Sequence, residues 1–244
     1  MKSILLICVN YKSYDALQAF LASVHEAEKQ VQGKMRVEVE VVDNSEHNVG
    51  YLGGALPVYN RRAAQFDYVS ISNVDLQLAP DFLAQLLMLQ SDGVGWWAPD
   101  IYTPTQRRHE NPYMLKRPTR YNFRIWNLIY SSVLIFKLYY LLHLLKGKTA
   151  RTYPPMPIYA GHGAFMLLTK AFVQAYPQVH FPSFMYNEEI YLAELARQAD
   201  LPVRYAPTLR IENIGSVSTG RVRQRQKSAW NKQSLEMIKK MFFV

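Results

Sequence analysis

Residues 4–11 read ILLICVNY, an apolar run that stops abruptly at Asn10. Its length and composition are typical of a buried strand. Strand-like and helix-like segments then alternate: strands at 4–9, 37–42 and 69–72, and helices at 16–24 and 80–89. This alternation predicts an α/β fold with a mixed, mainly parallel sheet flanked by helices.

Polar side chains stand where each of these strands ends. They are Asn10, Asp43, Asn44, Asn73 and Asp75. In open α/β sheets, ligands bind beyond the carboxyl ends of the parallel strands, so these side chains should share one site. A carboxylate such as Asp75 on a short turn is a suitable ligand for Mg²⁺ or Mn²⁺, although the turn alone could be structural.

Two further segments could carry chemistry. Gly50, Gly53 and Gly54 would let the backbone approach a nucleotide closely, or could simply form a loop; they lack the dinucleotide-binding spacing. Glu188 and Glu189 open a predicted helix, where acids either complement the helix dipole or supply a general base. Apolar neighbours would raise the pKa of such a base toward a useful value.

The charge balance points to an anionic partner. Lys and Arg exceed Asp and Glu by nine, and basic residues flank the almost wholly apolar stretch 128–145. As a helix this stretch would reach only about 27 Å, and Lys137 interrupts it. We therefore expect a helix lying on an anionic membrane surface, a buried core helix and a dimer contact being the alternatives.

The two ends of the chain suggest a cytoplasmic protein with a second membrane contact. The apolar run at 4–9 is too short for a signal peptide. Beyond residue 220 there are seven basic residues against Glu236, which suits either a lipid-facing or a solvated helix. The lone Cys8 excludes a disulfide framework and a cysteine-based zinc site.

Several short motifs follow one another in a characteristic order. They are ICVNY (7–11), VVDNS (41–45), NVGYLGG (48–54), SNVD (72–75), GAFML (163–167), FMYNEE (184–189), YAP (205–207) and GSVSTG (215–220). Together they resemble glycosyltransferase family 2, in its rhamnosyltransferase-like branch with the GT-A fold.

The resemblance implies a role for each matching residue. The nucleotide-sugar donor would be bound by Val9, Asn10, Tyr11, Asp43, Asn44, Gly50, Gly54 and Asn73. Asp75 would reach the diphosphate through Mg²⁺ or Mn²⁺, and Glu212 or Asn213 stands where many members carry a metal-binding His. Glu189 would be the base, with Glu188 beside it. Gly163 would lie on the acceptor side with His162, a residue that local backbone could equally satisfy.

The expected organisation is a single domain over residues 1–220 with a basic amphipathic tail at 221–244. Within the domain we expect a nucleotide-sugar-binding half at 1–100, an insertion with the membrane-facing helix at 101–155, and an acceptor and catalytic half at 156–220.

The expected activity is inverting transfer from a dTDP-rhamnose or UDP-hexose type of donor. The resemblance implies a lipid-linked surface-glycan acceptor (O-antigen, lipopolysaccharide or capsule) at the inner face of the cell membrane. A catalytically inactive transferase-like scaffold is the alternative. A nucleic-acid-binding protein is disfavoured, because no recognition motif accompanies the charge.

Overall fold

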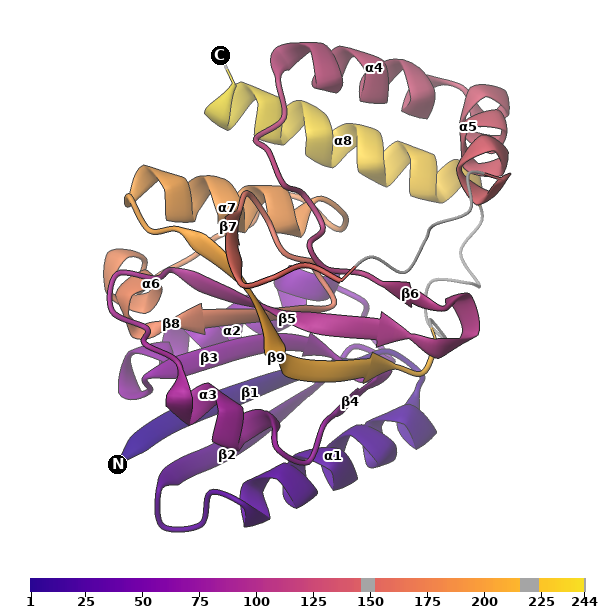
Figure 1. Ribbon diagram of the computed structural model, residues 1–244. Coiled ribbons are helices and arrows are strands. Elements are labelled where there is room, and N and C mark those ends of the chain that lie inside the picture. Colours follow the sequence, from indigo (N-terminus) through magenta and orange to yellow (C-terminus); the bar gives the residue numbers. More distant parts are fainter. Residues whose placement is uncertain (146–151, 216–223, 244) are drawn as a thin grey trace.

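The computed structural model describes residues 1–145, 152–215 and 224–243 (Figure 1). The strands are β1 (Lys2–Asn10), β2 (Met35–Asp43), β3 (Tyr68–Asn73), β4 (Leu76–Leu78), β5 (Trp96–Thr103), β6 (Arg108–His109), β7 (Met156–Ile158), β8 (Phe165–Thr169) and β9 (Val203–Asn213). The α-helices are α1 (Tyr14–Lys29), α2 (Tyr51–Arg62), α3 (Phe82–Met88), α4 (Arg120–Ser131), α5 (Val133–Leu145), α6 (Lys170–Ala175), α7 (Glu188–Gln198) and α8 (Gln224–Phe242).

The described strands form one mixed sheet in the order β2-β1-β3-β8-β5-β9-β4, with β6 added to β5 and β7 to β9. The pairs β1–β2, β1–β3 and β5–β9 are parallel and contain most of the paired residues. The predicted mixed, mainly parallel α/β sheet is therefore confirmed. The glycine-rich stretch after residue 48, for which a loop was one of the two interpretations, begins helix α2 at Tyr51.

The sheet is buried on both faces, which explains the unbroken apolar sequence of β1. Helices α2, α6, α7 and α8 cover one face of the sheet, and α1 and α3 cover the other (Figure 1). Leu5 and Ile7 pack on the first face, and Ile4 and Leu6 pack on the second. All four side chains are fully buried, and each contributes about 1.5–3 kcal/mol by leaving water. The carboxyl end of β1 is thereby held rigidly at one edge of the molecule.

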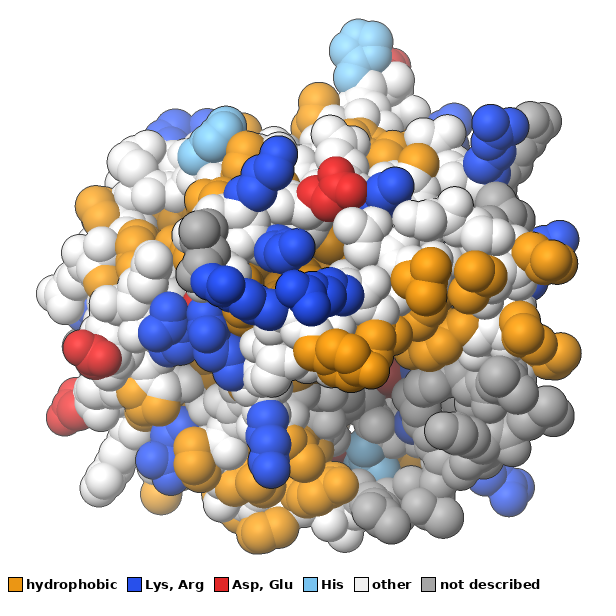
Figure 2. Space-filling model, turned by 90° about the horizontal axis from the view of Figure 1, so that it is seen from above, with side chains coloured by type: hydrophobic (Ala, Val, Ile, Leu, Met, Phe, Trp, Pro, Cys, Tyr) orange, Lys and Arg blue, Asp and Glu red, His pale blue; other side chains and the backbone are white. Residues whose placement is uncertain are grey.

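The apolar stretch 128–145 is divided between two helices. The chain becomes extended at Ser132, which ends α4 before α5 begins. Within the described part of the chain, no helix is both long enough and apolar enough to span a bilayer. Exposed side chains on α5 include Leu134, Leu138 and Leu141, with Leu134 at 78%. A buried core helix, one of the alternatives for this stretch, does not describe these side chains. Figure 2 shows Lys and Arg side chains beside hydrophobic ones on the face that carries α4, α5 and α8.

The basic C-terminal segment joins the core. Helix α8 lies alongside α4 (Figure 1), and Leu235, Ile238 and Phe243 are buried in the cluster that also contains α7. Ser228 of α8 donates a hydrogen bond to the carbonyl of Tyr130 on α4, at 2.7 Å. A solvated tail does not describe this helix. Residues 216–223, which include most of the GSVSTG motif, lie outside the described residues, as do 146–151.

Arg117 is one of the basic residues that precede the apolar stretch 128–145, and it makes an internal contact. Its guanidinium donates to Glu194 of α7 at 2.7 and 2.9 Å and to the carbonyl of Phe242 on α8 at 2.8 Å. Glu194 is fully buried, and Arg197 and Tyr159 also donate to it. These hydrogen bonds hold the pKa of Glu194 below its usual value despite the burial.

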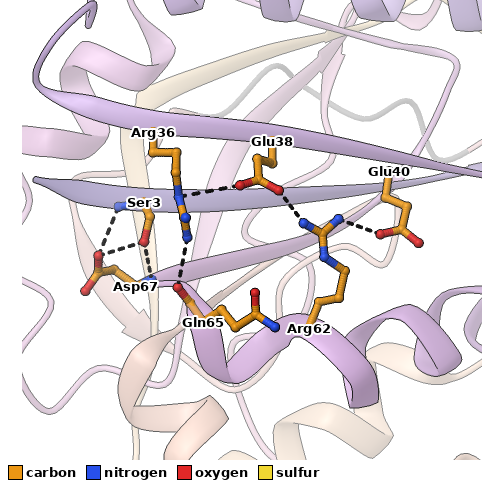
Figure 3. Close-up of polar contacts among 7 residues, drawn as sticks. All are labelled: Ser3, Arg36, Glu38, Glu40, Arg62, Gln65 and Asp67. Atoms are coloured by element: carbon orange, nitrogen blue, oxygen red, sulfur yellow. Dashed lines mark hydrogen bonds and ion pairs between the residues drawn. The ribbon is translucent and has the colours of Figure 1, made fainter.

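A polar network fixes the position of α2 against the edge strand (Figure 3). Arg62 of α2 bridges Glu38 and Glu40 of β2, with 2.7 Å to Glu40. Nearby, Asp67 accepts hydrogen bonds from the backbone and hydroxyl of Ser3 at 2.9 and 3.0 Å. The polar half of the alternating β2 sequence thus binds α2, whose first turn faces the candidate site.

Candidate active site

A cavity of about 640 Å³ lies at the carboxyl ends of β1 and β3 and beside the first turn of α7. The sequence-predicted residues that line it are Val9, Tyr11, Asn44, Gly50, Asn73, Asp75, His162, Gly163, Glu188 and Glu189. The cavity thus unites both halves of the chain, with acids from positions 75 and 189 in its wall.

Three predicted donor residues support the cavity without lining it. Asn10 is fully buried and donates to Asp43 at 3.4 Å, while its side-chain oxygen accepts from the backbone of Ser13 at 3.2 Å. Asp43 is exposed, and hydrogen bonds from Ser45 and Tyr14 lower its pKa. At Gly54, an added Cβ would lie 3.0 Å from the side-chain amide of Asn44, so the glycine lets α2 approach that residue.

Gly50 joins the donor loop to the second half of the chain. Its φ of +86° is in the region that favours glycine, and an added Cβ would lie 1.8 Å from the carbonyl oxygen of Phe184. The buried amide of Asn44 donates to the Gly50 carbonyl at 2.9 Å. The glycine is therefore required by a close contact between two backbone segments.

Asp75 lies just beyond β3, and its side chain is largely buried at the cavity wall. Its carbonyl accepts from the backbone of Ile214 at 3.1 Å, which brings Asn213 into the same lining. Its neighbour Glu212 is exposed and is not among the lining residues, because successive residues of β9 face opposite sides. The structure therefore brings Asn213, but not Glu212, to Asp75.

The donor set suits a hard divalent cation. Among the described residues there is no group of three or more His, Cys, Asp or Glu side chains placed to hold a metal. The lining does offer the carboxylate of Asp75 with the side-chain oxygens of Asn73 and Asn213. Mg²⁺ commonly binds one or two carboxylates and completes its shell with phosphate and water, so a metal shared with a diphosphate fits these residues.

Glu188 and Glu189 occupy the first turn of α7. Glu188 is buried and accepts a hydrogen bond from the backbone of Tyr186 at 2.8 Å. Burial, followed by the charge of Glu189, raises the pKa of Glu188 to about 8. Burial also raises the pKa of Glu189, against the opposing effect of a hydrogen bond from Tyr113. Two such neighbouring acids titrate as a pair and can accept a proton near neutral pH.

His162 is held by local backbone contacts, and its contact with an acceptor stays a prediction. Its Nδ1 accepts from the backbone of Ala164 at 3.2 Å, and its own backbone nitrogen donates to Asn111 at 2.8 Å. Its ring also lines the cavity and meets that of Tyr113 edge-on at 5.3 Å. Local backbone contacts thus fix a side chain that faces the site.

Part of the cavity wall was missed by sequence reasoning. Tyr113 follows β6, while Trp230 and Asn231 come from α8. Trp230 packs on Phe184, with ring centroids 4.7 Å apart. No local pattern marks these residues, because each acts on a segment far away in the chain.

A second cavity of about 680 Å³ adjoins the first beneath α4 and α5. The two cavities share Arg108, Glu110, Tyr113, Tyr130, His162 and Asn187. The aromatic residues of the second cavity are Tyr113, Trp126, Tyr130, Tyr139 and Tyr153. Aromatic faces mixed with polar side chains can both stack on a sugar ring and hydrogen-bond its hydroxyls.

No protein-family model matches the chain, and no curated protein matches its sequence. Its structure is similar to the catalytic domain of Drosophila β1,4-galactosyltransferase 7 in complex with xylobiose, with a TM-score of 0.54 and 12% identity over 94% of this chain and 80% of that one. It is also similar to Staphylococcus aureus TarS 1–349, with a TM-score of 0.51 and 10% identity over 88% of this chain and 60% of that one.

A third similar structure is the mannosyltransferase PcManGT from Pyrobaculum calidifontis in complex with GDP-Man and Mn²⁺. The TM-score is 0.50 and the identity 11%, over 88% of this chain and 58% of that one. The chain has the GT-A fold of glycosyltransferases. The more specific resemblance, to family 2 and its rhamnosyltransferase-like branch, remains a prediction.

Proposed function

We propose that the protein is an inverting glycosyltransferase that moves a sugar from a nucleotide-diphosphate donor to an acceptor hydroxyl. The observation that carries the proposal is the shared cavity of Asp75 and Glu189 at the carboxyl edge of the sheet. Asp75 would bind a divalent cation and the diphosphate, and Glu189, whose pKa is raised, would act as the base. The similar folds of known glycosyltransferases support this assignment.

The donor would occupy the side formed by β1, β2 and β3. Tyr11 and Asn44 line this side and would hold the nucleoside, while Asn73 and Asp75 would face the diphosphate. Mg²⁺ or Mn²⁺ bound there would neutralise the charge that develops on the leaving diphosphate. The donors we favour are of the dTDP-rhamnose or UDP-hexose type.

Glu189 would accept the proton of the acceptor hydroxyl. The acceptor oxygen then forms a bond to the anomeric carbon, the bond from that carbon to the diphosphate breaks, and the configuration inverts. The charge of Glu189 raises the pKa of its buried neighbour Glu188, so the two acids titrate as a pair. Gly163 offers no side chain to cover the Glu189 carboxylate.

The acceptor would enter through the second, aromatic cavity. This cavity ends under α4 and α5, where Leu128 is 63% exposed and Leu134, Leu138 and Leu141 also face outward. Arg120 and Arg124 of α4 are exposed, and Figure 2 shows Lys and Arg side chains beside hydrophobic ones on this face. An apolar surface with adjacent cations suits an anionic membrane and a lipid-linked glycan of the O-antigen, lipopolysaccharide or capsule type.

A screen of nucleotide sugars tests the proposal. Purified protein with Mn²⁺ would be heated with UDP-, dTDP- and GDP-linked sugars, and one class should raise the melting temperature because it binds only the native state. That donor should then release its nucleoside diphosphate in the presence of a lipid-linked acceptor. Binding without turnover would identify an inactive scaffold, and the absence of binding to any donor would refute the proposal.

A further inference from the structure

The turn that precedes the two glutamates has an unusual backbone. Tyr186 and Asn187 have φ angles of +73° and +63°, one after the other. Residues with a side chain rarely adopt this conformation, and Tyr tolerates it less well than Asn does. Contacts from elsewhere must therefore hold the turn in place.

Helix α8 supplies those contacts. The side-chain amide of Asn187 donates to the hydroxyl of Ser234 at 2.6 Å, and Ser234 is fully buried. The Ser234 hydroxyl in turn donates to the carbonyl of Asn231 at 3.2 Å. Trp230, one turn earlier on α8, packs against the rings of Phe184 and Tyr186.

The side chain of Asn187 does not make the capping hydrogen bond that is usual at its position. Asn187 is the N-cap of α7, where an Asn side chain normally accepts from the first turn of its own helix. Here it makes no such bond, and its amide binds α8. The direction of the first turn of α7, which carries Glu188 and Glu189, therefore depends on α8.

We infer that α8 is part of the catalytic architecture, with Asn187 and Ser234 as positioning residues for the glutamate pair. The inference rests on the proposed function for the role of Glu189. The contact by which α8 holds the turn before the two glutamates does not depend on that function. None of the motifs quoted from the sequence lies in α8 (Gln224–Phe242).

Single substitutions test the contact. Ser234→Ala removes the hydroxyl that accepts the hydrogen bond. Asn187→Gly removes the amide that donates it and keeps a residue that adopts a positive φ readily. Each variant should lower kcat by about tenfold or more, leave KM for the nucleotide sugar unchanged, and shift the pH profile of kcat. Because both remove the same bond, the double variant should be no worse than the stronger single variant.

Ser228→Ala is the matched control. Ser228 is also a buried serine of α8 and also donates one hydrogen bond, but to Tyr130 of α4. Its kcat and pH profile should stay at the wild-type level. If Ser234→Ala and Asn187→Gly behave like Ser228→Ala, or if their effects on kcat simply add, the inference is wrong.

A measurement without turnover separates this inference from the proposed function. The glutamate pair contributes to the dependence of the melting temperature on pH, because burial raises the pKa of both acids in the folded state. Ser234→Ala and Asn187→Gly should move the midpoint of that dependence, whereas Ser228→Ala should not. If the wild-type protein were inactive, the proposed function would be refuted. The pH dependence of the melting temperature would still test whether α8 positions the glutamate pair. Identical midpoints in all four proteins would overturn it.

Discussion

Gly163 faces the carboxylate of Glu189 so closely that an added Cβ would lie 3.1 Å from Oε2. The absence of a side chain at this position leaves the carboxylate open to the cavity that both residues line. In the proposed reaction, the acceptor hydroxyl has to reach this oxygen.

Gly163→Ala should therefore impair the reaction more than the fold. The new methyl group would push the Glu189 carboxylate by a few tenths of an ångström or shield it from the acceptor. We expect kcat to fall about tenfold with a small change in melting temperature, measured by steady-state kinetics and thermal unfolding. A kcat at the wild-type level would show that the space above Gly163 is not used.

Glu189→Gln should remove the base and keep the binding site. Loss of a general base typically lowers turnover by about 10²–10⁴-fold, while donor affinity measured by thermal shift should persist. Glu212→Gln is the matched control, because Glu212 is exposed and lies outside the cavity lining. Near-normal activity of Glu189→Gln would show that another group accepts the proton.

The pH dependence of stability should reveal the buried acid Glu188. Its pKa is about 8 in the folded protein against 4.5 for an ordinary Glu, with Glu189, Tyr186 and Tyr51 as its titratable neighbours. Between these two values the folded state binds more protons than the unfolded state, so the free energy of unfolding falls as pH rises.

Glu188→Gln should flatten that fall, because Gln carries no charge at any pH. At pH 8 the variant should melt at least about 2–4 °C above the wild type, and at pH 4 the difference should vanish or reverse. If the melting temperatures of the two proteins changed with pH in the same way across this range, the raised pKa of Glu188 would be contradicted.

Removal of divalent cations should stop transfer. Excess chelator is expected to abolish release of the nucleoside diphosphate, and added Mn²⁺ should restore it. Asp75→Asn should require a higher Mn²⁺ concentration for half-maximal rate, whereas Glu212→Gln should not. Turnover that persists in excess chelator would remove the metal role from Asp75.

The exposed leucines of α5 should carry membrane binding. Replacing Leu134, Leu138 and Leu141 with Ser should lower the fraction bound to vesicles containing anionic lipid by about tenfold or more, because each leucine loses apolar area that the bilayer would cover. Flotation measures the bound fraction. Met88→Ser, an exposed apolar position on α3, serves as control. Unchanged flotation would assign α5 to a partner subunit.

The sheet and its ligand-binding edge could be predicted from local sequence. The strands at 4–9, 37–42 and 69–72 have clear patterns, and the carboxyl ends of parallel strands must meet at one edge. Asn44, Asn73 and Asp75 therefore lie together, as expected.

The residues that lie beside Asp75 were harder to predict. Side chains alternate between the two faces of a strand, but this alternation identifies the cavity-facing residues only where the length of the strand is known. The strand-like pattern of residues 203–206 stops at Pro207, but β9 continues to Asn213, with a register shift in its pairing to β5. That extension decides that Asn213 lines the cavity and that Glu212 does not.

The place of α8 could not be predicted for a different reason. Basic residues spaced among apolar ones fit a lipid surface and a protein surface equally well, since the pattern shows only that one face is apolar. The partner is decided by α4 and α7, which end at Ser131 and Gln198, well before α8 begins at Gln224.

Arg117 gives the C-terminal helix a mechanical constraint. The same guanidinium holds the buried Glu194 of α7 and the main chain of α8 at Phe242. If α8 moved outward without α7, either the hydrogen bond from Arg117 to the Phe242 carbonyl would break or Arg117 would leave the fully buried Glu194. The two helices should therefore open together or not at all, and their amide protons should exchange with solvent as one cooperative unit.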